Sequence, residues 1–329
     1  MAVFSIAYPM VRAAAQEVVD RATTANAPKN KVVATITVGS GPNVIVVSPN
    51  SDFVYVVNQN DNTISAIDAS NRAVVGSYSA GSNPAGLAIT PDGKELYVTN
   101  FITNGTVTIL NAATGALIKT VTGVGNHPKL LAISPDGKQA YVPDQDSGTV
   151  SVIDTATQAV TSSISIGTSA ISVVFSPKGK AAYVCDSTDN AVFVIDTTTL
   201  KVVDKISTTD PLWCAVNPKG KRDVYVRNYS AETISVVQNK KVIKIIQEPQ
   251  YPEKFAVTKN GKYLYVPFFM NGSAPGDTVV MISTTSYKTI GEPITVGNEP
   301  SCVTIAADQK YAYVSNQEDG TVSVIDIQQ

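Results

Sequence analysis

The stretch YVVNQNDNTISAID at residues 55–68 contains a short apolar strand that opens with tyrosine, a polar turn and a second apolar strand. The same pattern returns as YVTNFITNGTVTILN at 97–111, YVPDQDSGTVSVID at 141–154 and YVSNQEDGTVSVID at 313–326. Val, Ile and Tyr favour strands, whereas the Asn, Asp and Gly between them favour turns. We therefore expect a chain of repeated β-hairpins.

The tyrosine that opens each hairpin recurs seven times, at Tyr55, Tyr97, Tyr141, Tyr183, Tyr225, Tyr265 and Tyr313. Successive spacings are 42, 44, 42, 42, 40 and 48 residues. A further strand precedes each tyrosine and ends in a turn such as SPDG, and another, such as residues 32–39, leads into a corner that usually contains proline. Four short strands at this period are typical of a β-propeller. The sequence thus predicts an all-β, seven-bladed propeller over residues 31–329.

The two ends of the repeat region predict how the ring closes. The chain enters with an outermost strand at 32–39 and leaves after a third strand at 322–326, so the first strand can complete the last blade and remove an exposed edge. Residues 1–30 form a separate extension. Apolar residues at helical spacing after Pro9 predict a short amphipathic helix there, which we expect to plug the channel from below.

Composition limits the partners and the location. A formal net charge of −2 argues against a nucleic-acid partner, and no run of 18 apolar residues predicts a membrane span. The three cysteines, Cys185, Cys214 and Cys302, are too few for a disulfide framework and favour a reducing compartment. No basic segment precedes the apolar N-terminal residues. We expect a cytoplasmic protein, with a periplasmic or secreted location as the alternative.

The Tyr-Val-x-Asn and Val-Ser-Val-Ile-Asp signatures, with their SPDG turns and VGxxP corners, resemble the YVTN β-propeller repeat family over residues 31–326. Lactonase-like propellers are more distant relatives. The resemblance implies binding proteins, secreted or periplasmic in many members, while related propellers serve as lactonases and as cofactor-binding enzyme domains. Since one fold hosts many functions, the site must decide among these.

The repeat also predicts which loops share a face. The proline corners and the loops after each Tyr-Val-x-Asn lie at one end of the blades, here called the top, and the SPDG turns and both chain ends lie at the bottom. The residues before the corner positions are mostly polar: Gly41, Asn83, His127, Thr168, Asp210, Tyr251 and Glu299. Two residues past the corner, five blades have a smaller residue suited to a packed inner strand. Blade five has the large Trp213 there, and blade six has the charged Lys254.

Departures from the repeat cluster in blades five and six, and such departures often mark function. Blade six carries an unusual corner at 247–254 and a loop predicted to extend from 269 to 277. We predict a pocket at the top of these blades, whose ligand-binding residues are Trp213, Arg227, Tyr229, Tyr251, Phe268 and Phe269. Candidate acid–base residues are Glu253, Lys254, Asp210 and His127. The alternative is that the repeat has drifted, with Arg227–Asp210 or Glu253–Lys254 as ordinary ion pairs.

The sequence indicates no metal and no cofactor. His127 is the only histidine, no Cys-x-x-Cys is present, and no glycine-rich loop opens a helix. The Asn or Asp that follows most Tyr-Val-x triplets is expected to cap a turn rather than to form a site. A group of basic residues falls in or beside the bottom turns of blades four to six, where solvation is the expected role: Lys178, Lys180, Lys201, Lys219, Lys221, Arg222, Lys240, Lys241, Lys259 and Lys262.

Two functions remain open from the sequence. The first is a non-catalytic propeller that recognises a small molecule or peptide at the top face near blades five and six. The second is a metal-independent intracellular enzyme, a cyclase, isomerase or lactonase-like protein, that uses the same pocket for acid–base catalysis. The regular repeats favour the first, and the asymmetry of one pocket favours the second.

Overall fold

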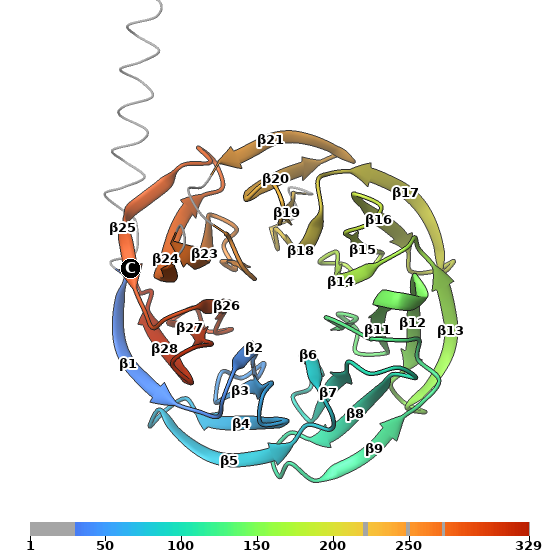
Figure 1. Ribbon diagram of the computed structural model, residues 1–329, viewed down its shortest axis with the longest axis horizontal. Helices are drawn as coiled ribbons and strands as arrows, with labels where there is room; N and C mark the ends of the chain where they lie inside the picture. The colour runs from blue at the N-terminus through green and yellow to red at the C-terminus, as the bar shows by residue number, and fades with distance from the viewer. Residues whose placement is uncertain (1–29, 220–222, 248–250, 272–273, 329) are drawn as a thin grey trace, which may run out of the picture.

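Seven four-stranded antiparallel sheets surround a central axis in the computed structural model (Figure 1), which describes residues 30–219, 223–247, 251–271 and 274–328. The predicted seven-bladed, all-β propeller is confirmed. The expected N-terminal helix and channel plug fall outside the described residues. Within the described ranges, no helix is long and apolar enough to cross a membrane.

Each blade runs from an innermost to an outermost strand. The first three blades contain β2 (Pro42–Val47), β3 (Phe53–Asn58), β4 (Thr63–Asp68) and β5 (Ala73–Ser79); β6 (Pro84–Ile89), β7 (Glu95–Asn100), β8 (Thr106–Asn111) and β9 (Leu117–Val121); and β10 (Ala132–Ile133), β11 (Gln139–Asp144), β12 (Thr149–Asp154) and β13 (Ala159–Ser165). A short 3-10 helix, η1 (Gln145–Ser147), follows β11 at the top.

The remaining blades repeat this order. They contain β14 (Ala170–Phe175), β15 (Ala181–Asp186), β16 (Ala191–Asp196) and β17 (Lys201–Ser207); β18 (Pro211–Val216), β19 (Val224–Asn228), β20 (Thr233–Gln238) and β21 (Lys241–Gln247); β22 (Ala256–Val257), β23 (Tyr263–Asn271), β24 (Ala274–Ser283) and β25 (Thr289–Thr295); and β26 (Pro300–Ile305), β27 (Tyr311–Asn316) and β28 (Thr321–Asp326).

The ring closes as expected, because β1 (Lys31–Thr37) pairs antiparallel with β28 and becomes the outer strand of blade seven. Ile36 of β1 is 6% exposed and packs in a core cluster that joins blades seven and one. This pairing covers the outer edge of β28, which would otherwise expose its backbone hydrogen-bonding groups.

The core consists of clusters between neighbouring blades, and each repeat tyrosine lies in one of them. Six of these tyrosines are at most 2% exposed. The seventh, Tyr183 of β15, is only partly buried. The junction between blades four and five is therefore packed differently from the other six.

The Asn and Asp residues after Tyr-Val-x have a structural role, as expected, but most of them link neighbouring strands rather than cap a turn with the side-chain oxygen. Asn58 donates hydrogen bonds from its amide to Thr63 and Ser65, and Asp144 accepts them from Thr149 and Ser151. These side chains cross-link the second and third strands of a blade at their top ends, and they are buried rather than directed at a ligand.

One expectation for blade six was wrong. The segment predicted as a long loop from 269 to 277 instead lengthens the hairpin, with β23 reaching Asn271 and β24 beginning at Ala274. The ladder is irregular at Phe269 and continues with Met270 opposite Pro275 and Asn271 opposite Ala274. The top of blade six is therefore a projecting hairpin.

Candidate functional site

Two prolines coincide with unusually short inner strands in blades three and six. Pro143 and Pro267 stand two residues after the repeat tyrosine, where the other blades have a residue with a backbone N–H. Because proline has no N–H, the inner strand cannot receive that ladder bond. In both blades the regular inner strand shrinks to two residues, β10 and β22.

The segments before β10 and β22 keep a backbone hydrogen bond to their own blade, at the Pro143 and Pro267 carbonyls, and they also pair with the next blade. Leu130 forms a parallel bridge with Ser172 of blade four, and Lys254 forms one with Cys302 of blade seven. The N–H of Val303 donates to the carbonyl of Lys254 at 2.8 Å. The residue directly after the corner proline is charged in these two blades alone, Lys129 in blade three and Glu253 in blade six. The same backbone change thus places charged side chains on the innermost segments of both blades.

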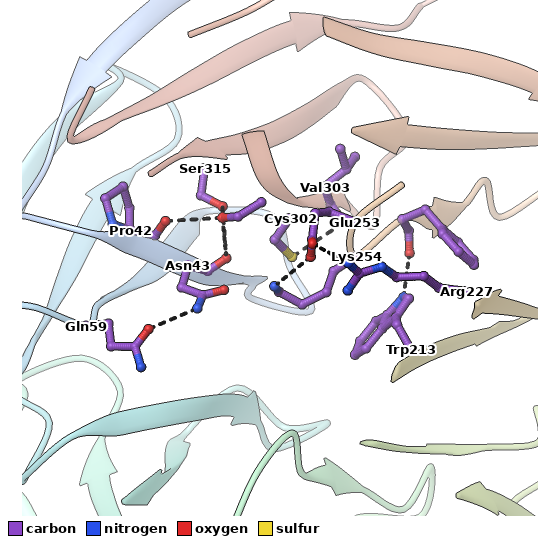
Figure 2. A network of polar contacts seen from close by, with 12 residues as sticks. Pro42, Asn43, Gln59, Trp213, Arg227, Glu253, Lys254, Cys302, Val303 and Ser315 are labelled. Carbon is purple, nitrogen blue, oxygen red and sulfur yellow. Dashed lines mark hydrogen bonds and ion pairs between the residues drawn. The ribbon is translucent and has the colours of Figure 1, made fainter. Parts of the chain in front are cut away.

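An ion network joins blades five and six at the top. Nη2 of Arg227, on β19, lies 2.5 Å from Oε1 of Glu253, and Nζ of Lys254 lies 3.5 Å from Oε2 of the same carboxylate. The three side chains are only 6%, 14% and 11% exposed. Low exposure increases the attraction between the charges but also removes their hydration, so the loss of one partner, which leaves the other buried alone, is costly. Figure 2 shows Lys254 extending from this network towards Asn43 of blade one.

Several buried polar atoms at the top of the propeller have no hydrogen-bond partner within the described part of the protein. Among the described residues, Nε of Arg227, Oδ1 of Asn43 and Oε1 of Gln145 are buried and make no hydrogen bond within the protein. Buried polar groups in native proteins are nearly always satisfied by protein, water or ligand. These three atoms therefore offer one donor and two acceptors to a bound molecule or to water.

Lys129 was missed by the sequence reasoning. Burial lowers the pKa of its amine, and the positive charge of Lys254 lowers it further, while Asp146 acts in the opposite direction. The amine also lies 4.1 Å from the centroid of the Phe101 ring. The pKa of Lys129 in blade three is therefore sensitive to a charge carried by blade six. The signal in the sequence was the charged residue directly after the corner proline.

The aromatic residues of blades five and six divide into core and surface. Trp213 of β18 is partly buried, and its indole N–H donates to the carbonyl of Phe255 at 3.1 Å (Figure 2). Phe268 is 3% exposed and belongs to the core cluster behind it. Tyr229 is 45% exposed, and its ring lies 6.1 Å from that of Tyr251.

Two of these aromatic residues interact with charged side chains. The guanidinium of Arg227 lies 5.2 Å from the Tyr229 ring centroid. A hydrogen bond to Glu232 raises the pKa of Tyr251. Phe269 is partly buried and its N–H donates to the carbonyl of Tyr251. Tyr229 and Tyr251 therefore form an aromatic border beside the ion network, whereas Phe268 supports it from the core.

The other two acid–base candidates have separate partners. Asp210 accepts a 2.5 Å hydrogen bond from the Ser230 hydroxyl. The Arg227–Asp210 ion pair considered from the sequence is not formed, and Arg227 pairs with Glu253. Nδ1 of His127 lies 2.7 Å from Oδ2 of Asp146, and its ring packs against Phe101. His127 therefore belongs to the blade-three group that contains Lys129.

The described part of the chain contains no group of three or more His, Cys, Asp or Glu residues placed to hold a metal ion. Cys185, Cys214 and Cys302 are free and buried, and the last packs beside Lys254 at the bridge between blades six and seven. The chemistry available at the top is therefore that of amines, a guanidinium, carboxylates and one imidazole.

Two family models match parts of the chain. One, described as lactonase, 7-bladed beta-propeller, matches residues 18–165, and the other, cytochrome D1 heme domain, matches residues 130–265. Among solved structures, a chain of Kuenenia stuttgartiensis hydrazine synthase is similar, with a TM-score of 0.76 and 22% identity over 88% of this chain and 96% of that one. At this identity the likeness establishes the fold alone. No curated protein sequence matches significantly.

Proposed function

We propose that this propeller binds a small molecule or peptide with an acidic group at the top face, where Arg227, Glu253 and Lys254 meet near the central axis. The observation that carries the proposal is the buried ion network, in which two cations share one carboxylate. Lys129 of blade three, whose pKa is lowered by the charge of Lys254 and raised by that of Asp146, is a further cation at this end of the propeller. An acidic ligand would compensate this local excess of positive charge and bond the unpaired Nε of Arg227.

The surrounding residues suit ligand recognition. The Tyr229–Tyr251 border supplies apolar surface, and few polar groups converge beside it, which is the usual composition of a small-molecule site. Trp213 is partly buried, packs against the core cluster of blades five and six, and is the only tryptophan in the chain. Its fluorescence can therefore report on binding without a label.

The first experiment is native mass spectrometry of the purified protein for a co-purified ligand, followed by titration of small mono- and dicarboxylates against Trp213 fluorescence. Lys254→Met should weaken binding of an acidic ligand about tenfold or more, since a hydrogen bond to a charged group contributes about 1.5–3 kcal/mol. Lys310→Met, which removes a lysine paired with Asp308 on the opposite face, is the matched control. Equal binding by the Lys254 variant and the control would overturn the proposal.

A second candidate is a metal-independent, lactonase-like hydrolase or cyclase, favoured by the partial match to the lactonase family. The His127–Asp146 pair holds the imidazole by Nδ1 and leaves Nε2 to accept a proton from water, while a lysine amine stabilises the developing oxyanion. Water adds to the lactone carbonyl as Nε2 takes its proton, the acyl carbon–ring oxygen bond then breaks, and Nε2 returns the proton to the leaving oxygen, so a hydroxy acid is formed. Lactone hydrolysis that persists unchanged in His127→Gln and Glu253→Gln would exclude this assignment.

The cytoplasmic location is retained as part of the proposal. It is consistent with three free cysteines, which a reducing compartment keeps as thiols. Cell fractionation with the untagged chain tests it, and recovery in the culture medium or periplasm would contradict it.

A further inference from the structure

The junction between blades four and five holds a cavity of about 990 Å³ that opens at the bottom face. The corresponding junctions between blades seven and one, and between blades three and four, hold cavities of about 360 Å³ and 280 Å³. The large cavity falls within the size range of ligand pockets. It is remote from the top site, because it is lined by the SPKG-type turns and the lower halves of the strands.

A shortened hairpin explains the cavity. In blade four, residues 197–200 connect the third and fourth strands, and Leu200 packs against the cluster that contains Tyr141 of the preceding blade. In blade six, residues 284–288 form this loop, and Tyr287 packs against the cluster of Tyr225. Each loop thus covers the tyrosine of the blade before it.

Blade five has only Asn239 and Lys240 at this position. Both residues have positive φ, 48° and 66°, as a tight two-residue hairpin turn requires. This turn supplies no apolar side chain, so Tyr183 of blade four remains partly buried and faces the cavity. The 40-residue spacing between Tyr225 and Tyr265, the shortest in the chain, contains this deletion.

The cavity has an apolar interior and a basic rim. Its interior is lined by Tyr183, Val194, Ile206, Val216, Val224 and Val237, and its rim by Lys178, Lys180, Lys219 and Lys240. Lys240 pairs with Asp204 at 2.9 Å, whereas the other three lysines have no ion-pair partner among the described residues. Asp196 is the one carboxylate in the lining, and Thr198 and Thr199 already hold it within its own turn.

We propose that this cavity binds a medium-chain carboxylate, with its hydrocarbon chain against Tyr183 and the valines and its carboxylate at Lys178 and Lys180. Burial of an alkyl chain is favourable by about 0.8 kcal/mol per methylene, and exposed amines at the rim select an anionic head. The sequence had indicated simple solvation for these lysines. In the proposal, their position at the rim of an apolar cavity gives them the role of binding an anionic head group.

The test is isothermal titration calorimetry of the full chain with hexanoate, octanoate, decanoate and dodecanoate below their micelle concentrations. Affinity should rise about fourfold per added methylene while the chain still enters the cavity, which is the methylene value converted to a ratio. Dodecyltrimethylammonium has a chain of the same length and a cationic head, and its affinity should be lower than that of dodecanoate by at least about tenfold. Equal affinity for both heads, or no binding of dodecanoate, would overturn the proposal.

Three variants localise the site. The double variant Lys178→Gln/Lys180→Gln should weaken dodecanoate binding about tenfold, and Lys262→Gln, the equivalent turn lysine of blade six outside the cavity, should not. Val216→Phe copies Phe175, which ends the inner strand of blade four and packs 4.8 Å from the Tyr141 ring. It should fill the cavity and abolish binding. Unchanged dodecanoate binding in a folded Val216→Phe variant would refute this location. Titrations of the top site that follow Trp213 fluorescence should be the same in all three variants.

Discussion

Asp144 stands where blades one, two, five and seven have asparagine, and its burial makes the substitution Asp144→Asn informative. Loss of hydration on burial raises the pKa of its carboxyl from 3.8 to about 6, against the opposing hydrogen bonds from Ser151 and Thr149. One pKa unit corresponds to about 1.36 kcal/mol, so the shift of about 2 units costs about 3 kcal/mol of folding free energy when the group is ionised.

The pH dependence follows from the sign of this shift. Below the unfolded pKa of 3.8 both states carry the proton and the cost is absent. Between 3.8 and about 6 the unfolded state ionises first, so the cost grows as the pH rises, and above about 6 it is constant. Asp144→Asn should therefore raise the free energy of unfolding by up to about 3 kcal/mol at pH 7 and by much less at pH 4.

Urea denaturation of both proteins at pH 7 and pH 4 measures this difference. Asn58→Asp is the reverse control, since Asn58 makes the same cross-link to Thr63 and Ser65 in blade one and should become costly at pH 7 once it is a carboxylate. The reasoning is refuted if Asp144→Asn gives no stabilisation at pH 7, or the same stabilisation at both pH values.

Other predictions concern the ion network, the ring closure and the lysine pair. Arg227→Met and Glu253→Gln should each destabilise the fold by about 3–5 kcal/mol in urea denaturation. The double variant should lose less than their sum, because the Arg227–Glu253 pair is lost only once, although Lys254 remains without its carboxylate. Additive losses would contradict a direct pair. Ile36→Ala should cost about 2–5 kcal/mol because it opens a cavity at the closing strand, and a loss below 1 kcal/mol would show that β1 contributes little. Lys254→Met should raise the pKa of Lys129, measured by NMR of the ¹³C-methylated amine, and an unchanged pKa would show that the two amines do not interact.

The number of blades, the strand order and the closure by β1 could be derived from the sequence because they depend on local preferences repeated along the chain. A tyrosine strand, a Pro–Gly turn and an Asn cross-link act within a few residues of one another, so a period near 42 specifies each blade before any blade packs on its neighbour. The same local logic located the irregular blades five and six. It failed at 269–277, since the choice between a loop and a longer hairpin depends on whether the strand finds a partner.

Side-chain partners across blades were decided by the tertiary structure. Arg227 had Asp210 as a candidate partner in its own blade, but the segment before β22 brings Glu253 closer from the next one. The bridges of Leu130 to Ser172 and of Lys254 to Cys302 join neighbouring blades, so they too could be found only in the folded ring. The repeat and its closure could be read from the sequence, whereas the cavity beside Tyr183 and its link to the short turn at Asn239 appear only when the blades pack against one another.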